Sequence, residues 1–217
     1  MSNKPFTHFL QHMRQQYDQA IILENDLMDN PLHYFEKWFK EATEANTPEP
    51  NAMDFCTVSN NKPSSRIVLL KGVDERGFVF YTNYDSRKGN ELIENPFVSL
   101  NFFWQPLARQ VRIEGEISKV TAEESDQYFK TRPRESQIGA WASPQSTVIA
   151  SRQVIEDEIA RYTEQFKDVE VPRPPHWGGY LVKPQRIEFW QGRLNRLHDR
   201  FLYEDSPGGW MVFRLAP

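Results

Sequence analysis

The chain has 217 residues, which is enough for one domain with a substantial core. Its formal net charge of −4 excludes a general attraction to nucleic acid or to anionic membranes, so an anion site has to be built from a local cluster of cations. The single cysteine, Cys56, excludes an intramolecular disulfide, and no set of Cys and His residues has zinc-ligand spacing, so we expect no metal site.

Cysteine usage and the N-terminal sequence bear on where the protein works. One cysteine suits a reducing compartment. The sequence MSNKPFTH at 1–8 lacks the apolar stretch of a signal peptide, and no uncharged apolar run reaches the length of a membrane span. We therefore expect a cytoplasmic protein that binds neither membranes nor nucleic acid.

The first fifty residues are predicted to be helical. An amphipathic stretch covers 6–17, and a second helix begins after Asn30, because Pro31 suits the first helical position. The sequence TPEPN at 47–51 is typical of a linker. We expect residues 1–50 to form an N-terminal helical segment that packs on the rest, residues 51–217, within a single domain overall.

Short β-rich runs with helices between them fill the remainder of the chain. Their spacing indicates a barrel or a closed antiparallel sheet, so the predicted class is mainly β with helices, α+β. Strands are predicted at 53–58, 65–71, 78–82, 97–104, 110–120, 179–182, 187–191, 200–203 and 210–215, and helices at 86–94, 122–131, 136–142 and 151–166.

Two cations stand where a helix start disfavours them. Ser86 opens a predicted helix and is followed by Arg87 and Lys88, which oppose the positive end of the helix dipole. A bound phosphate would gain from both side chains and from the free backbone N–H groups. The alternative is that both side chains simply extend into solvent.

A second pattern lies in RIVLLK at 66–71. Strand alternation places Lys71 on one face with Ile67 and Leu69, and Arg66 on the other face with Val68 and Leu70. A lysine among aliphatic side chains either lies at a rim, where its ammonium reaches water, or has a buried anionic partner.

The segment IEFWQGRLNRLHDR at 187–200 contains the densest group of functional side chains. Alternation up to Gln191 predicts a strand, Gly192 breaks it, and Arg196, His198 and Arg200 then recur every second residue and share a face. Three basic groups on one face need an anionic or π-rich partner, and Trp190 offers a stacking plane. The alternative is an edge strand whose charges face water.

This segment resembles the C-terminal signature of the pyridoxine (pyridoxamine) 5′-phosphate oxidases; Arg193 and Leu194 fall in free positions of that signature. The resemblance continues through RIVLLK at 66–71, FYTN at 80–83, SRK at 86–88, RQV at 109–111, RPRESQIGAW at 132–141, QS at 145–146 and the closing RLAP. It implies an antiparallel FMN-binding split β-barrel that forms a homodimer with FMN at the subunit interface. It also implies oxidation of pyridoxamine and pyridoxine 5′-phosphates to pyridoxal 5′-phosphate, with O₂ as acceptor and H₂O₂ as product.

The resemblance also implies residue roles. Arg196 and His198 would be catalytic and lie over the pyridine ring of the substrate. FMN would be held by Arg66, Ile67, Val68, Leu69, Leu70, Lys71, Tyr81, Thr82, Arg87, Lys88, Gln110, Gln145, Ser146, Trp190 and Arg200. The substrate would be contacted by Arg14, Tyr17, Lys71, Tyr128, Arg132, Ser136, Arg196, Leu197 and His198, with Arg14 and Tyr17 closing over it.

Two other functions stay open at this stage. One is a different split-barrel flavin or deazaflavin reductase that uses a nicotinamide donor; it would not need RLHDR together with Lys71, Tyr128, Arg132 and Ser136. The other is a non-catalytic flavin- or vitamer-binding protein, which could lack Arg196 or His198. The sequence has neither a GxGxxG after a predicted strand nor a GxxxxGK[ST] motif, so neither a Rossmann dinucleotide site nor a P-loop is supported.

Overall fold

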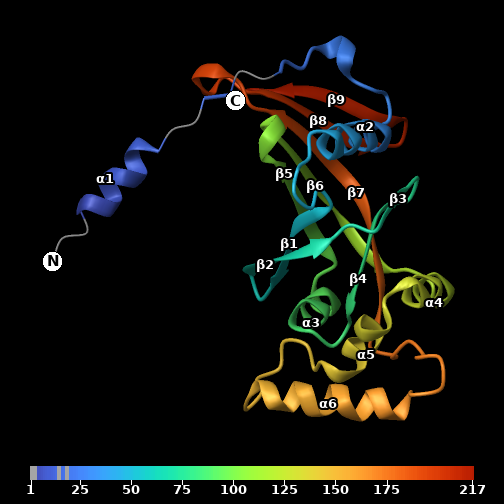
Figure 1. Cartoon of the computed structure of the whole chain (residues 1–217). Helices are drawn as coiled ribbons and strands as arrows, with labels where there is room; N and C mark the ends of the chain where they lie inside the picture. Colours follow the sequence, from blue (N-terminus) through green and yellow to red (C-terminus); the bar gives the residue numbers. More distant parts are fainter. Residues whose placement is uncertain (1–3, 14–15, 18–19) are drawn as a thin grey trace. The chain divides into compact units, whose positions relative to one another are not determined.

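The computed structural model describes residues 4–13, 16–17 and 20–217 (Figure 1). Among these residues the helices are α1 (Lys4–His12), α2 (Pro31–Glu44), α3 (Arg87–Glu94), α4 (Ala122–Thr131), α5 (Arg134–Ala142) and α6 (Arg152–Gln165). The strands are β1 (Ala52–Ser59), β2 (Lys62–Leu69), β3 (Gly72–Asp74), β4 (Gly77–Asn83), β5 (Phe97–Trp104), β6 (Arg109–Lys119), β7 (Trp177–Gln191), β8 (Asp199–Ser206) and β9 (Gly209–Leu215). Short 3₁₀ turns are η1 (Glu24–Asp26), η2 (Gln105–Leu107) and η3 (Leu194–Arg196).

The strands form one sheet in the order β2-β1-β5-β6-β7-β4-β3, with β8 pairing β7 and β9 pairing β8. The pairs β1–β2, β1–β5, β3–β4, β4–β7 and β8–β9 are antiparallel. The predicted antiparallel α+β class is therefore confirmed. The expectation of a closed sheet is not met among the described residues, because the strand order leaves β2 and β3 as end strands.

Some element boundaries differ from the prediction. Helix α1 ends at His12, whereas the predicted amphipathic stretch ran over 6–17, of which residues 14 and 15 lie outside the described residues. The short strand β3 was missed. The two strands predicted at 179–182 and 187–191 are one 15-residue strand, β7. The strand continues through Pro184 because glycines lie beside it. A Cβ on Gly115 would stand 2.2 Å from the Lys183 carbonyl oxygen, and one on Gly77 would stand 2.8 Å from Pro184 Cδ.

The chain divides into two compact units. The first comprises 1–50, 103–111 and 188–217; the second comprises 51–102 and 112–187. Strands β5, β6 and β7 pass from one unit into the other along the chain, so neither unit is a continuous stretch of sequence. The predicted division at residue 50 within a single domain stays a prediction.

The core of the first unit is aromatic and lies where α2 meets β7 and β8 (Figure 1). Asn30 caps α2, since its Oδ1 accepts a hydrogen bond from the Leu32 N–H at 2.9 Å. The Phe189 ring of β7 is fully buried, with ring centroids at 4.5 Å from Tyr34 and 5.2 Å from Trp38. This packing fixes β7 at the point from which the 187–200 segment continues.

The second unit has its core between β1 and β4, with a smaller cluster beside the helices. Phe55 of β1 and Phe80 of β4 are fully buried, and their ring centroids are 4.8 Å apart. Helices α5 and α6 lie side by side (Figure 1). The smaller cluster comprises Phe129, Ile138, Phe166, Val171 and Trp177.

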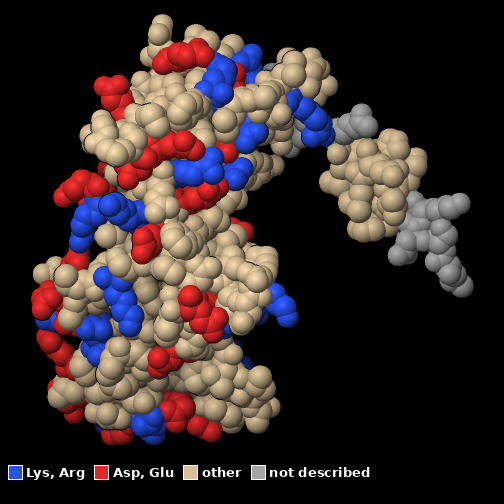
Figure 2. All heavy atoms as spheres, turned by 180° about the vertical axis from the view of Figure 1, so that it is seen from behind, with Lys and Arg blue, Asp and Glu red and all other residues tan. Residues whose placement is uncertain are grey.

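Charged side chains are interspersed rather than separated by sign on the face that Figure 2 shows. Many form ion pairs, such as Arg152 with Glu156 on α6 at 2.9 Å. None of the helices in the described part of the chain combines the length and the apolar character that a membrane span needs.

Candidate functional site

Near the start of α3 lies a buried lysine, Lys88. The Lys88 side chain is only 7% exposed. Its Nζ donates hydrogen bonds to Thr82 Oγ1 at 2.9 Å, Ser86 Oγ at 3.0 Å and Gln145 Oε1 at 2.6 Å. The turn before α3 is tight, because a Cβ on Gly89 would stand 1.8 Å from the Tyr84 carbonyl oxygen. Glycine at this position lets the helix start turn Lys88 inward.

Lys88 is a cation without a hydrogen-bonded anion among the described residues. Burial lowers its pKa to about 8; the charge of Arg66 adds to this effect and that of Glu91 opposes it. The alternative that Lys88 extends into solvent is therefore excluded. A buried ammonium with neutral acceptors gains most from an approaching anion, so this position fits a phosphate.

Two arginines converge on Glu91 beside this lysine. Arg66 Nη2 lies 3.0 Å from Glu91 Oε2, and Arg87 Nε lies 2.8 Å from Glu91 Oε1. Burial raises the pKa of Glu91, but hydrogen bonds from Thr57, Ser64 and the two arginines outweigh it and hold the pKa at about 2. The carboxylate is thus ionised and fixes both guanidinium groups. The sequence reading did not identify Glu91, whose partners come from β1, β2 and α3.

A hollow of about 690 Å³ opens beside this group. Arg87, Gln145 and Ser146 all contribute to its lining. Ser146 has a φ of 72°, a left-handed conformation that a non-glycine residue adopts only where the surrounding chain holds it. The structure therefore brings together the cations predicted at 66, 87 and 88 with Thr82 and the Gln-Ser pair.

A second group of predicted residues lies on an aromatic stack. The rings of Tyr81 and Tyr128 are parallel within 15°, with centroids 3.9 Å apart. Trp177 continues the stack at 5.6 Å from Tyr81 and 6.2 Å from Tyr128. The guanidinium of Arg132 lies 4.6 Å from the Trp177 ring centroid. Trp177 thus supports both predicted substrate residues, and the sequence reading missed it.

Arg132 carries an unused donor. Among the described residues its Nη1 is buried and has no hydrogen-bond partner. Burial lowers the pKa of its guanidinium, which nevertheless stays charged. Unpaired buried donors are costly, so a bound anion would relieve the cost. Ser136 is half-buried in the first turn of α5, which begins two residues after Arg132.

Lys71 lies just beyond β2 and is exposed. The aliphatic residues on its face are exposed too, Ile67 by 66% and Leu69 by 36%, whereas Leu70 on the opposite face is buried. Lys71 was predicted either to lie at a rim with its ammonium in water or to have a buried anionic partner. In the single chain it is exposed, as the first alternative requires. Among the described residues nothing covers the face of β2 that carries Ile67 and Leu69, and this face is apolar.

In the first unit three aromatic side chains meet at the end of β7. The His198 ring centroid lies 4.6 Å from that of Trp190 and 6.2 Å from that of Tyr17. The Tyr17 ring lies edge-on to Trp190 at 5.9 Å. Gly192 makes room for it, since a Cβ there would stand 2.7 Å from Tyr17 Cγ. Arg14, predicted to act with Tyr17, lies outside the described residues.

The prediction that Arg196, His198 and Arg200 share one strand face is wrong. Arg196 ends the 3₁₀ turn η3, and β8 begins only at Asp199, so the three basic residues do not share a strand face. The reason is backbone conformation: Asn195 and Arg196 have φ of 54° and 63°, which turns the chain instead of extending it. Arg200 lies in β8, while Arg196 and Leu197 are exposed on the turn.

His198 has a defined hydrogen bond within this turn. Its Nδ1 accepts the backbone N–H of Arg193 at 3.0 Å. Burial lowers the pKa of the imidazole, the charges of Arg196 and Arg200 lower it further, and Asp199 opposes them. The ring is therefore neutral near pH 7, with the proton on Nε2, because Nδ1 is the acceptor.

Arg200 and Gln110 occupy strands near this turn. The Arg200 guanidinium is paired with Glu188 through contacts of 2.8 and 3.1 Å and donates to the Ala216 carbonyl at 2.9 Å. Gln110 is half-buried on β6, next to Arg109. The resemblance assigned both residues to FMN, and that assignment stays a prediction.

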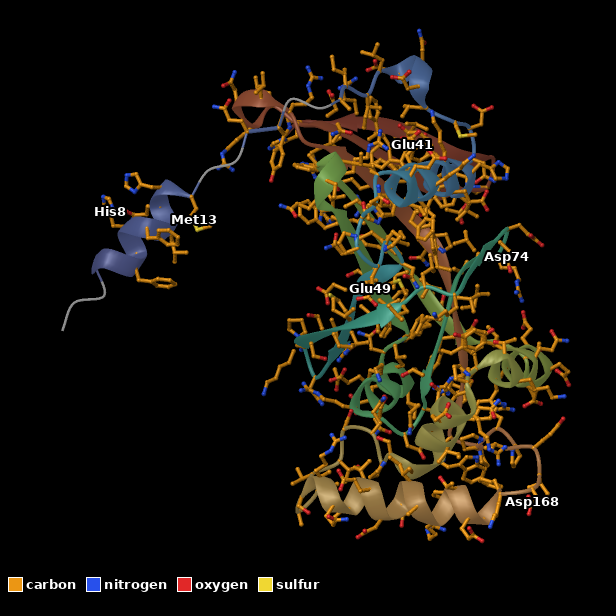
Figure 3. All side chains as sticks on the ribbon, in the orientation of Figure 1. His8, Met13, Glu41, Glu49, Asp74 and Asp168 are labelled. Atoms are coloured by element: carbon orange, nitrogen blue, oxygen red, sulfur yellow. The ribbon has the colours of Figure 1, made fainter. Side chains whose placement is uncertain are left out.

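Arg109 is a structural arginine that the sequence reading missed. Its guanidinium lies 4.3 Å from the Trp38 ring centroid and pairs with Glu41, labelled on α2 in Figure 3. Its Nε donates to Gln191 Oε1 at 2.9 Å, and the Gln191 amide donates to the Leu107 carbonyl at 3.0 Å. This network holds the start of β6, and with it Gln110, against α2 and the end of β7.

The predicted site residues thus fall into the two units. The first unit holds Tyr17, Gln110, Trp190, Arg196, Leu197, His198 and Arg200, and the second holds Arg66 to Lys71, Tyr81, Thr82, Arg87, Lys88, Tyr128, Arg132, Ser136, Gln145 and Ser146. Among the described residues no group of three or more His, Cys, Asp or Glu side chains is placed to hold a metal ion.

Solved structures define the class of protein. PhzG from Burkholderia lata, solved with tetrahydrophenazine-1-carboxylic acid, is 29% identical, covers 92% of this chain and 99% of its own, and superposes with a TM-score of 0.86. A pyridoxamine 5′-phosphate oxidase-related, FMN-binding protein from Nostoc punctiforme has a TM-score of 0.69 at 14% identity, covering 88% of this chain and all of its own, which shows the fold alone. The class is the split barrel of these proteins.

Sequence comparison gives the family. The family model described as "Pyridoxamine 5′-phosphate oxidase" matches residues 39–166. A second family model, described as "Pyridoxine 5′-phosphate oxidase C-terminal dimerisation region", matches residues 177–217. Proteins named pyridoxine/pyridoxamine 5′-phosphate oxidase are similar over nearly the whole chain: that of Synechocystis sp. is 51% identical over 96% of this chain and 98% of its own, and that of Burkholderia multivorans 53% over 96% and 99%. The chain belongs to the pyridoxamine 5′-phosphate oxidase family and is an oxidoreductase.

Proposed function

We propose that the protein is an FMN-dependent oxidase that converts pyridoxamine 5′-phosphate and pyridoxine 5′-phosphate to pyridoxal 5′-phosphate, with O₂ as acceptor and H₂O₂ as product. One observation carries the proposal: the second unit presents two separate cationic groups for which the described part of the chain supplies no hydrogen-bonded anion. One is the buried ammonium of Lys88 with neutral acceptors, and the other is the unpaired buried Nη1 of Arg132. Cofactor and substrate each carry one phosphate, which matches two such groups.

The residues around α3 fit the phosphate of FMN. Lys88 and Arg87 would bind it together with Ser146 and Gln145, and Arg66 would contribute charge from β2. Gln110, Trp190 and Arg200 would hold FMN from the first unit's strands. When bound, FMN supplies a two-electron acceptor that takes a hydride from the substrate and passes the electrons to O₂.

The residues around the aromatic stack fit the substrate phosphate. Arg132 would use its free Nη1, with Tyr128, Ser136 and Lys71 as further donors. In the first unit, His198 and Arg196 would lie over the pyridine ring, where the Nε2–H of a neutral His198 is the donor that remains available. Arg14 and Tyr17 would close over the ring. Anchoring both phosphates would orient two flat rings for hydride transfer.

We also propose that the protein works as a homodimer in the cytoplasm, with FMN at the interface between subunits. The match of 177–217 to a dimerisation region supports the dimer. The exposed apolar face of Ile67 and Leu69 on β2 supports it independently, because such faces are ordinarily covered by a partner. The cytoplasmic location is supported by the single cysteine.

The decisive experiment is an anaerobic titration of the purified, flavin-loaded protein. Pyridoxamine 5′-phosphate is expected to bleach the flavin absorption, and admission of O₂ is expected to restore it with release of H₂O₂ and pyridoxal 5′-phosphate. NADH and NADPH serve as control donors and are expected to leave the spectrum unchanged. Bleaching by a nicotinamide but by neither vitamer would make the protein a reductase instead, and bleaching by none would make it a non-catalytic binding protein.

A further inference from the structure

The turn between Gly192 and Asp199 is held by an ion pair that does not involve the predicted catalytic side chains. Arg193 Nη1 lies 2.7 Å from Asp199 Oδ2, and both side chains are largely buried, at 31% and 12% exposure. The pair joins the two ends of the turn that carries Arg196 and His198. Arg193 occupies a free position of the family signature, so the signature does not require this pair.

The turn needs such support because its backbone is strained. Asn195 and Arg196 both have left-handed φ values of 54° and 63°, and non-glycine residues keep this conformation only where the surroundings hold it. A single backbone hydrogen bond, from the Leu197 N–H to the Leu194 carbonyl at 3.1 Å, closes the centre of the turn. The ion pair is the longer connection across its ends.

Asp199 also ties the turn to two distant segments. Its Oδ2 accepts the Ile22 N–H at 3.2 Å, and its Oδ1 accepts from Arg214 Nη1 at 3.0 Å. Burial raises the pKa of Asp199, but hydrogen bonds from Arg193, Ile22 and Arg214 outweigh it, so the pKa lies below its usual range. The carboxylate is charged at neutral pH and has three donors directed at it.

Arg193 connects this carboxylate to His198. Its guanidinium binds Asp199, while its own backbone N–H donates to His198 Nδ1 at 3.0 Å. A displaced Arg193 would withdraw that N–H, and the imidazole would lose the partner that fixes its ring plane and keeps the proton on Nε2. The rings of Trp190 and Tyr17 also contact the imidazole, through ring faces and edges, and such contacts do not select a tautomer.

We propose that Arg193 and Asp199 are positioning residues for His198, which hold its imidazole in one orientation with Nδ1 as acceptor and Nε2 as the donor available to the substrate. The inference rests on the proposed function, in which His198 acts at the pyridine ring. It adds two residues that touch neither the substrate nor FMN in that proposal.

The test compares Arg193→Ala with Arg193→Lys, since lysine can still pair with Asp199 and both variants keep the backbone N–H. Arg152→Ala, which breaks the exposed Arg152–Glu156 pair on α6, is the matched control. The first readout is ¹⁵N NMR of the histidine rings in the flavin-loaded protein, with the His198 signals assigned by their loss in His198→Ala. The chain has five histidines, so few signals need to be separated. The second readout is the rate of anaerobic flavin reduction by pyridoxamine 5′-phosphate.

Arg193→Ala is expected to mix the His198 tautomers and to slow flavin reduction by roughly tenfold, less than the loss in His198→Ala, with unchanged flavin content. Arg193→Lys is expected to recover most of both readouts, and Arg152→Ala to leave both unchanged. Should Arg193→Ala fail to fold, Asp199→Asn is measured in the same way, because it weakens the pair but keeps the side-chain oxygen. An unchanged His198 spectrum and rate in Arg193→Ala, or in that substitute, would overturn the inference. An unchanged rate in His198→Ala would instead contradict the proposed role of His198.

Discussion

At the scale of single residues, the most informative group is the buried ammonium of Lys88. Its Nζ donates to three neutral oxygen acceptors, and the charges of Arg66 and Glu91 act on its pKa in opposite directions. Burying an ammonium without an anion lowers the stability of the folded protein, and a bound anion would offset that cost. The position therefore suits an anionic ligand that is not part of the chain. The same argument applies to Arg132, whose buried Nη1 has no hydrogen-bond partner among the described residues and would gain one from a bound anion.

The depressed pKa of Lys88 predicts a pH-dependent affinity for FMN. Burial lowers this pKa to about 8, so the ammonium loses its proton as the pH rises through that value, whereas a bound phosphate dianion would raise the pKa again. Binding then takes up a proton above pH 8, so the affinity should fall by up to about tenfold per pH unit as the pH rises above that value. Fluorescence titration of the apoprotein with FMN measures this. Lys88→Arg, which stays charged, should bind with little pH dependence; the same slope in that variant would assign the effect to another group.

A second prediction at this scale concerns Trp177, which stacks on Tyr128 and supports Arg132. Trp177→Ala should destabilise the protein by about 3–5 kcal/mol, because the ring is buried. It should also raise KM for pyridoxamine 5′-phosphate by roughly tenfold, since Arg132 loses a cation–π contact of about 1–2 kcal/mol. Trp177→Phe, which keeps a ring plane, should retain most of both. Thermal unfolding and steady-state kinetics measure the two effects; lower stability with an unchanged KM would make Trp177 a core residue only.

Which of these residues can be found from a sequence depends on the range of their contacts. The cations at 87 and 88 stand out because they violate a local rule of helix termini. Trp177, Arg109 and Arg193 carry no such local signal, and Glu91 shows only its helical spacing of four from Arg87. Their roles come from partners brought together by strand register or by a turn with left-handed residues, and neither can be computed from spacing alone.

At the scale of elements, the start of α3 depends on the close approach of Gly89 to the turn that precedes the helix. Gly89→Ala should disrupt this start, because the added Cβ would stand 1.8 Å from the Tyr84 carbonyl oxygen. Loss of Lys88 from its acceptors should follow, with release of flavin on dialysis. Gly139→Ala on α5 is the matched control: its Cβ would meet nothing within 4 Å, and a helical Gly→Ala change gains up to about 1 kcal/mol. Full flavin retention in Gly89→Ala would show that the turn yields without harm to the site.

Hydrophobic periodicity was a good guide to the existence of elements and a poorer guide to their ends. Alternation found β1, β2, β5 and β6 within a few residues, and the capping box at Thr121 placed the start of α4. Periodicity did not predict that β7 is continuous, because Lys183 and Pro184 in mid-strand are typical of a turn. Gly77 and Gly115 on the neighbouring strands leave room for the backbone of β7 at this point.

At the scale of the whole molecule, the uncovered aliphatic face of β2 predicts association. We expect the wild type to sediment as a dimer. Ile67→Glu should shift it toward monomer, because Ile67 is 66% exposed in the single chain and a buried unpaired carboxylate would be costly at an interface. Ile159→Glu, at a residue of α6 that is 40% exposed, is the control. Analytical ultracentrifugation decides it, and a dimer of unchanged affinity in Ile67→Glu would place the interface elsewhere.

The passage of three strands through both units has a consequence for the order in which the chain can fold during synthesis. The second unit needs nothing beyond residue 187, whereas the first is assembled from its first fifty residues, a short internal piece and its last thirty. Contacts that span almost the full sequence are slow to close and form only after the C-terminus has left the ribosome. The nascent protein should therefore complete the lysine and arginine groups of the second unit first, and the histidine turn last.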